Sequence, residues 1–117
     1  MWQVVFTDVA GDDLQRAFSY ISEILKASVA AENLIIEAEK SIGNLADFPL
    51  SCPLVSDEYF ATIGVRFLTL NNYLAFYVAN DSTEVVTVIR FLYARRDWTA
   101  LLENPKRENE EDGLSAE

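Results

Sequence analysis

Arginine side chains concentrate in one segment of an otherwise acidic chain, with a tyrosine among them. Three of the six arginines, Arg90, Arg95 and Arg96, fall within seven positions of the stretch VIRFLYARRDW, and Arg66 precedes them in another apolar run. A guanidinium can stabilise phosphate charge, contact a partner, or form a solvated salt bridge. Tyr93 adds a phenol that can stack on a base or relay a proton. These residues are therefore candidates for a catalytic or contact surface.

The distribution of charge limits what this surface can bind. The chain has 19 acidic and 9 basic residues, a net charge of −10, which argues against a general nucleic-acid binder because Lys and Arg supply most of the affinity for phosphates. Residues 1–59 carry ten acids and three bases, and residues 103–117 carry six acids and two bases. Residues 60–102 carry four bases and three acids and form the one segment that is not acidic.

Length and composition favour one domain in the cytoplasm. At 117 residues, half of them apolar, the chain can bury a core without disulfides. The single cysteine, Cys52, fits a reducing compartment better than a secreted one. We expect neither a signal peptide nor a membrane span, because no apolar run reaches the roughly 18 residues that a span needs. Nothing in the residues suggests a metal or another cofactor.

The first half of the chain predicts a strand and two helices. Residues 2–7, WQVVFT, are rich in β-branched and aromatic types and indicate a short strand. Apolar residues at three- and four-residue steps predict a helix over about 10–26, with Asp12 and Asp13 in its first turn. A second such pattern covers about 31–45, with Ser28 as the N-cap. The short link makes the helices an antiparallel hairpin.

The second half predicts an antiparallel meander. Residues 46–58 contain two prolines and indicate an ordered loop. Alternation with a period of two then predicts strands over about 60–70, 73–79 and 84–93. Asn71-Asn72 suits a two-residue turn, which would pair Leu70 with Tyr73, Leu68 with Ala75, and Arg66 with Tyr77 on one face.

These elements define an α+β fold: a short first strand, an antiparallel helical hairpin, and a three-stranded antiparallel meander packed on the helices. Both faces of the meander are apolar, so we expect the face away from the hairpin to need a partner. Residues 96–102 can form one short helical turn. We assign residues 1–102 to a single domain and expect the acidic tail, residues 103–117, to be disordered.

Four stretches in this order resemble a known family. They are DLQRAFSYISEIL, FPLSCPLV, GVRFLTLNNYLAFYV and VVTVIRFLYARRDWTALL, and together they look like the RelE/ParE family of bacterial toxins and plasmid stabilisation proteins. The resemblance implies the toxin of a type II toxin–antitoxin pair, neutralised by a cognate antitoxin protein. One branch of the family cleaves mRNA on the ribosome; the other blocks DNA gyrase and has no catalytic site.

The ribonuclease branch can be tested against the residues. The resemblance assigns transition-state stabilisation to Arg66 and to Arg95 or Arg96, with Tyr93 at the position where many relatives carry histidine. Glu58 is a possible general base by a looser analogy. The chain departs from the pattern, however, because it has no histidine and no lysine between Lys40 and Lys106. An ordinary tyrosine, with a pKa of about 10, is a poor base at neutral pH.

Four further residues complete the candidate surface as binding residues: Glu58 if it is not catalytic, Tyr77 beside Arg66, Arg90, and Trp98. Each also has a structural interpretation, such as a strand arginine paired with an acid or an aromatic core anchor. Three hypotheses remain. The one we favour is a toxin that blocks a protein target of the gyrase type; the alternatives are a ribosome-dependent mRNA endonuclease and a non-toxic interaction module with the same fold.

Overall fold

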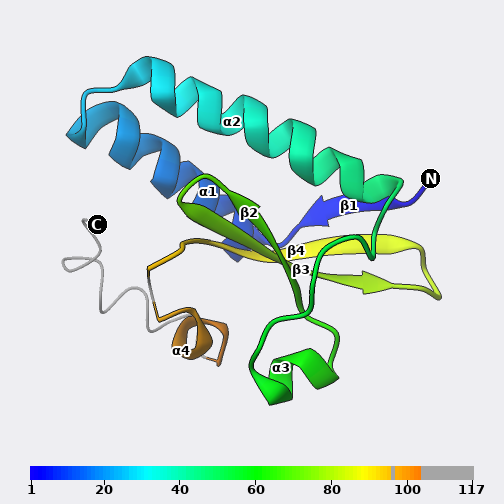
Figure 1. The fold of residues 1–117 in the computed structure, drawn as a ribbon. Helices are drawn as coiled ribbons and strands as arrows, with labels where there is room; N and C mark the ends of the chain where they lie inside the picture. Colours follow the sequence, from blue (N-terminus) through cyan, green and yellow to red (C-terminus); the bar gives the residue numbers. More distant parts are fainter. Residues whose placement is uncertain (96, 104–117) are drawn as a thin grey trace.

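A four-stranded sheet separates a helical hairpin on one face from two short helices on the other (Figure 1). The computed structural model describes residues 1–95 and 97–103. In chain order, the elements are β1 (Gln3–Phe6), α1 (Asp8–Ser19), the π-helix η1 (Tyr20–Ile24), α2 (Ser28–Gly43), the 3₁₀ helix η2 (Asn44–Ala46), α3 (Glu58–Thr62), β2 (Arg66–Leu70), β3 (Tyr73–Asn80), β4 (Val85–Tyr93) and α4 (Trp98–Glu103). The predicted α+β architecture is confirmed.

The meander has the register that the sequence predicts. Leu70 pairs with Tyr73, Leu68 with Ala75, and Arg66 with Tyr77. The turn is possible because Asn71 adopts a φ of 55°, which asparagine tolerates better than most residues. The strand order is β1-β4-β3-β2, and β1 pairs with β4 in parallel, from Gln3↔Val85 to Phe6↔Val88. That parallel pairing was not predicted, because the helical hairpin separates the two strands in sequence.

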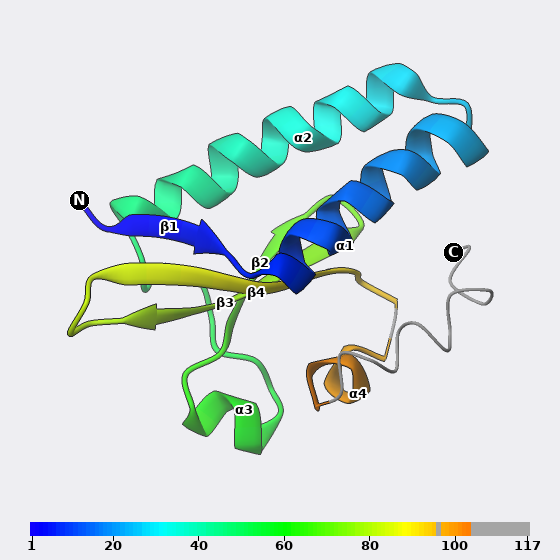
Figure 2. The same ribbon diagram turned by 180° about the vertical axis from the view of Figure 1, so that it is seen from behind.

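The helical hairpin covers one face of the sheet, as both views show (Figures 1 and 2). α1 begins at Asp8, earlier than predicted, because Thr7 Oγ1 accepts a hydrogen bond from the Ala10 N–H at 3.0 Å. The predicted N-cap of α2 is wrong: Ser28 is the first residue of the helix, and the capping position is Ala27, which has no side-chain oxygen to accept a hydrogen bond. Ala31, Leu34, Ala38 and Ile42 form the buried side of α2.

The opposite face of the sheet is covered by the chain itself, which differs from the sequence-based expectation. Residues 58–62, predicted as loop and strand, form α3 because Asp57 Oδ1 caps it by accepting the Phe60 N–H at 3.1 Å. α3 places Phe60 in a second apolar cluster with Val65, Phe76, Leu92 and Leu101 of α4. Part of the apolar surface that suggested a partner is therefore buried within the chain.

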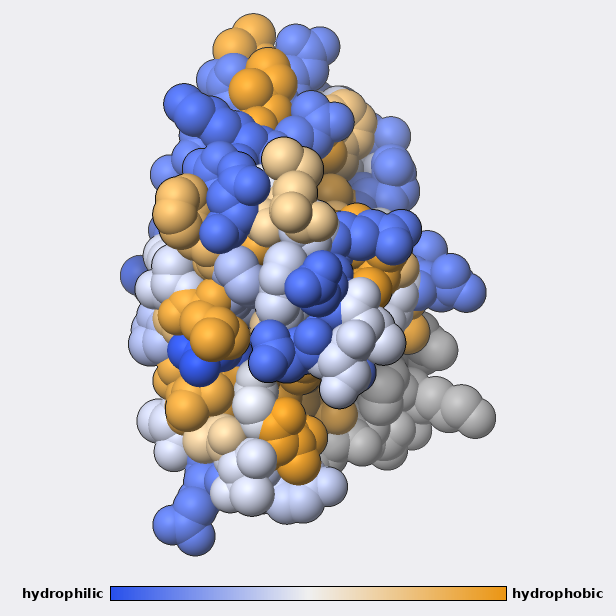
Figure 3. All heavy atoms as spheres, turned by 90° about the vertical axis from the view of Figure 1, so that its right-hand side faces the viewer, coloured by the Kyte–Doolittle hydropathy of each residue, from blue (hydrophilic) through white to orange (hydrophobic). Residues whose placement is uncertain are grey.

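Apolar side chains that remain exposed do not merge into one surface on the face seen in Figure 3, where they form separate patches among hydrophilic residues. In the chain as a whole, the exposed apolar residues include Phe48 and Leu50 of the loop after η2, which are 65% and 61% exposed. No helix in the described part of the chain is long and apolar enough to span a membrane. α4 reaches Glu103, the first residue of the predicted tail; the rest of that tail lies outside the described residues.

Candidate functional site

Arg66 anchors a loop. It is the first residue of β2, and its Nη1 donates a hydrogen bond to the Cys52 carbonyl oxygen at 2.6 Å. Two backbone hydrogen bonds also join this loop to the segment 65–67. The Phe67 N–H donates to the Pro53 carbonyl at 3.1 Å, and the Val55 N–H donates to the Val65 carbonyl at 3.0 Å. The half-buried guanidinium is thus directed at the outer edge of the sheet, where it holds the segment before α3.

Tyr77 holds the same loop from the neighbouring strand. Its side chain is fully buried, and its hydroxyl donates to the Pro49 carbonyl oxygen at 3.0 Å. Burial raises the pKa of the Tyr77 hydroxyl well above the ordinary tyrosine value, and the neighbouring Cys52 adds to the shift. A phenol with a raised pKa keeps its proton at neutral pH. Tyr77 therefore cannot act as a base there, and it anchors the loop together with Arg66.

Arg90 is buried in a network that joins three elements. Its Nε and Nη2 donate to Asp13 Oδ2 and Oδ1 at 2.7 and 2.8 Å, and its Nη1 donates to the Leu101 carbonyl of α4 at 3.0 Å. Asp13 Oδ2 also accepts the Phe91 N–H at 2.9 Å. Neither Asp13, 4% exposed, nor Arg90, 2% exposed, is available to a partner at the surface.

The position of Asp13 corrects the sequence-based interpretation. Asp13 was expected in the first turn of the helix, facing the N-terminal dipole, but α1 begins at Asp8 and Asp13 lies on its buried side with Ala10 and Ala17. β1 ends at Phe6, the Thr7 N–H still donates to the Val88 carbonyl at 3.0 Å, and the Asp13 carboxylate accepts the backbone N–H of Phe91 further along β4. The sequence contained a signal for this position, because Asp13 lies three residues after Ala10 and four residues before Ala17. That spacing places all three residues on one side of a helix.

Tyr93 and Arg95 lie at the far end of β4. The Tyr93 ring packs edge-on against Tyr73, with centroids 5.6 Å apart, and Arg95 is exposed two positions later. No hydrogen bond or ion pair within residues 1–95 and 97–103 involves the Arg95 side chain. Arg96, the alternative second cation, lies outside the described residues.

Strand geometry separates Arg66 from this strand end. Arg66 pairs with Tyr77 and Tyr93 pairs with Tyr73 on the intervening strand β3. Four residues along a strand and two strand spacings across place the Arg66 and Tyr93 Cα atoms about 17 Å apart. Because the Arg66 guanidinium is also bonded to the outer loop, the described residues do not bring the predicted catalytic set together.

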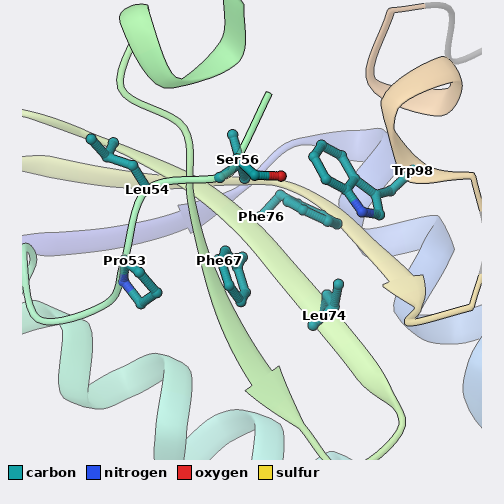
Figure 4. Close-up of a pocket in the computed structure, with 8 residues that line it drawn as sticks. Pro53, Leu54, Ser56, Phe67, Leu74, Phe76 and Trp98 are labelled. Atoms are coloured by element: carbon teal, nitrogen blue, oxygen red, sulfur yellow. The ribbon is translucent and has the colours of Figure 1, made fainter. Parts of the chain in front are cut away.

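Trp98 and Glu58 lie on the face opposite the helical hairpin. Trp98 of α4 packs against Phe76, with ring centroids 5.2 Å apart, and lines a groove of about 400 Å³ with Phe67 and Leu74 (Figure 4). Residues 53–56 form the other wall. Glu58, the exposed first residue of α3, does not line this groove. The groove is apolar and offers no acid–base pair.

The described residues contain no cluster of side chains that could bind a metal ion. Within them, no three His, Cys, Asp or Glu side chains come together in an arrangement that could hold an ion. The candidate site therefore consists of two separate parts: an exposed strand end with Tyr93 and Arg95, and an apolar groove beside Trp98. Such a surface can contact a partner, and its described residues supply no complete set for bond cleavage.

Comparison with known proteins identifies a family. The sequence model described as the ParE toxin of type II toxin–antitoxin systems matches residues 4–98. No curated protein matches the chain. The family match covers both helices of the hairpin and the whole sheet except Gln3, the first residue of β1.

Solved structures share the fold at low sequence identity. A chain from the chromosomal ParDE toxin–antitoxin system of P. aeruginosa is 18% identical, with a TM-score of 0.65 over 81% of this chain and 98% of that one. The RelBE2 toxin–antitoxin complex of Mycobacterium tuberculosis contains a chain that is 24% identical, with a TM-score of 0.52 over 79% and 96%. The isolated E. coli RelE toxin is 20% identical, with a TM-score of 0.53 over 92% and 98%.

Proposed function

The chain belongs to the ParE toxin family of type II toxin–antitoxin systems, and from this premise we propose that it inhibits growth by binding and blocking a protein target, with DNA gyrase as that target. The proposed neutralising partner is a cognate antitoxin, because the similar chains from P. aeruginosa and M. tuberculosis come from toxin–antitoxin systems. The proposed location is the cytoplasm, consistent with a single free cysteine.

One observation carries the choice of mechanism. The Arg66 guanidinium, which would have to stabilise a charged transition state, is bonded to the Cys52 carbonyl at 2.6 Å. The Cα atoms of Arg66 and Tyr93 are about 17 Å apart. RNA cleavage through the 2′-hydroxyl needs a base, a cation and an acid around one phosphate. Binding a protein needs no such set.

The other candidate residues support the same choice. Arg90 is bonded to Asp13 inside the molecule, and the Tyr77 hydroxyl is bonded to the Pro49 carbonyl oxygen. The chain has no histidine. Among the described candidates, Tyr93 and Arg95 remain accessible at the end of β4, where they suit contact with a protein surface.

The test is induced expression in bacteria with and without the antitoxin, followed by two assays in parallel. We expect growth arrest that the antitoxin prevents, loss of gyrase supercoiling activity with the purified protein, and intact mRNA in arrested cells. Cuts within translated reading frames, with supercoiling unaffected, would establish the ribonuclease alternative instead. Unchanged growth at verified soluble expression would identify a non-toxic interaction module.

A further inference from the structure

The outer side of α2 carries an unusual row of residues. Val29, Glu32, Ile36, Glu39 and Gly43, here called the α2 stripe, follow one another at alternating steps of three and four and therefore share one face. Val29 and Ile36 are 69% and 60% exposed, and the other three members are also exposed. We propose that the α2 stripe is a docking surface for a basic amphipathic helix of a partner protein.

The stripe has the spacing of a helix-packing seam. The core-facing side of α2 is already buried against the rest of the chain, so the exposed Val29 and Ile36 give the helix a second apolar side where a surface helix normally carries polar residues. They are seven residues apart, which is the repeat that brings side chains to one facing helix. The stripe is about 21 Å long, or about four turns.

The surroundings of the stripe leave room for a helix. Figures 1 and 2 show α2 along the outside of the molecule, and no described segment crosses its outer side. Gly43 ends the stripe, and a side chain built there would meet nothing within 4 Å. A partner helix can therefore approach the α2 backbone closely at this end.

Charge identifies the occupant. Glu32 and Glu39 are also seven residues apart, and neither forms an ion pair with any described residue. Lys40 is the one basic residue of α2. Lysines or arginines at heptad spacing on a facing helix would meet the two carboxylates, whereas a second copy of α2 would bring carboxylates together. The stripe thus fits a basic helix and disfavours self-association.

The inference is independent of the target proposed above and can be tested with synthetic helices. Two labelled helical peptides carry Ile at the same position of each heptad. At a second position of each heptad, one peptide carries Lys and the other carries Glu. Titrated with the full chain, the Lys peptide should bind about tenfold more tightly than the Glu peptide, and its affinity should fall as salt is raised. The variant Glu32→Lys/Glu39→Lys should reverse this preference.

Two controls make the test specific. The variant Asp81→Lys/Glu84→Lys changes the net charge equally at the β3–β4 turn and should keep the preference for the Lys peptide. Val29→Ser/Ile36→Ser should weaken binding of the Lys peptide about tenfold while circular dichroism shows unchanged helix content. The proposal is overturned if neither peptide binds, if both bind alike, if the control variant loses the preference, or if the chain forms a dimer that Ile36→Ser disrupts.

Discussion

Arg90 of β4 and Asp13 of α1, 77 positions apart in sequence, form a buried two-pronged ion pair that also reaches α4. The pair therefore connects the helical hairpin, the sheet and the last helix of the described chain. An arginine in the middle of the apolar strand VIRFL is explained by this partner on the facing helix. Its charge serves the fold and does not extend the surface formed by Arg95.

Replacing Asp13 by Ala should strongly destabilise the protein. The substitution leaves a buried guanidinium without its carboxylate and removes the acceptor for the Phe91 N–H, so we expect a loss of about 3–5 kcal/mol in the free energy of unfolding. Urea unfolding followed by circular dichroism measures this loss. Asp12→Ala, on the exposed side of the same turn, should change stability by less than about 0.5 kcal/mol. Equal effects of the two substitutions would contradict the role assigned to the pair.

Tyr77 should make stability depend on alkaline pH. Because burial raises its pKa in the folded state, the unfolded chain loses the phenolic proton first, starting near pH 10, while the folded chain keeps it. Stability should therefore be intact below about pH 10 and fall as pH rises toward the folded-state pKa. Urea midpoints at a series of pH values measure the fall, and Tyr77→Phe should reduce it. Tyr59→Phe, at a site 67% exposed, is the matched control and should leave the profile unchanged.

Substitution of Arg66 should lower stability, whereas substitution of Arg95 should lower activity and leave stability almost unchanged. Arg66→Ala removes a hydrogen bond from a charged donor to the Cys52 carbonyl, so we expect a loss of about 1.5–3 kcal/mol in the free energy of unfolding. Arg95→Ala should change stability by less than about 0.5 kcal/mol and weaken growth arrest at equal expression, because its exposed side chain is available to the target. Viable counts after induction provide the readout. Full toxicity of Arg95→Ala would remove this residue from the contact surface.

Backbone conformation predicts opposite effects at two turns. Glu84 has a φ of 56°, a conformation that costs most residues about 1 kcal/mol, so Glu84→Gly should raise stability or leave it unchanged. Gly64, before β2, has a φ of 91°, and Gly64→Ala should lower stability by about 1 kcal/mol although the added methyl would meet no atom within 4 Å. Thermal unfolding of both variants measures the difference. A stabilised Gly64→Ala would show that strain does not govern this turn.

Local patterns explain which parts of the fold could be predicted. The alternation in 66–80 and the pair Asn71-Asn72 determine the β2–β3 register, because both operate between neighbouring residues. Periodicity likewise predicts the helical hairpin. The sequence did not predict α3, because this helix follows a proline-rich loop and has only five residues after its N-cap, Asp57. So short a helix gives no clear periodicity.

The candidate site was less predictable for a different reason. Residue types singled out Arg66, Tyr77 and Arg90, but type and spacing do not reveal the distant group that each side chain contacts. Two of these side chains bond to carbonyls of the loop before α3, and the third bonds to Asp13. These contacts leave Glu58, Tyr93, Arg95 and Trp98 as the described candidates that a partner can reach.

The sequence by itself determined the class of fold, the meander register and the acidic character of the surface, since each depends on local order or on composition. Only the tertiary structure decided that β1 lies beside β4 and that the arginines have different roles. The physical reason is that a buried charge or an unpaired strand is stable only beside a partner group. Chain packing brings that partner from a distant part of the sequence. For Arg90 that partner is Asp13; for Arg66 it is the Cys52 carbonyl.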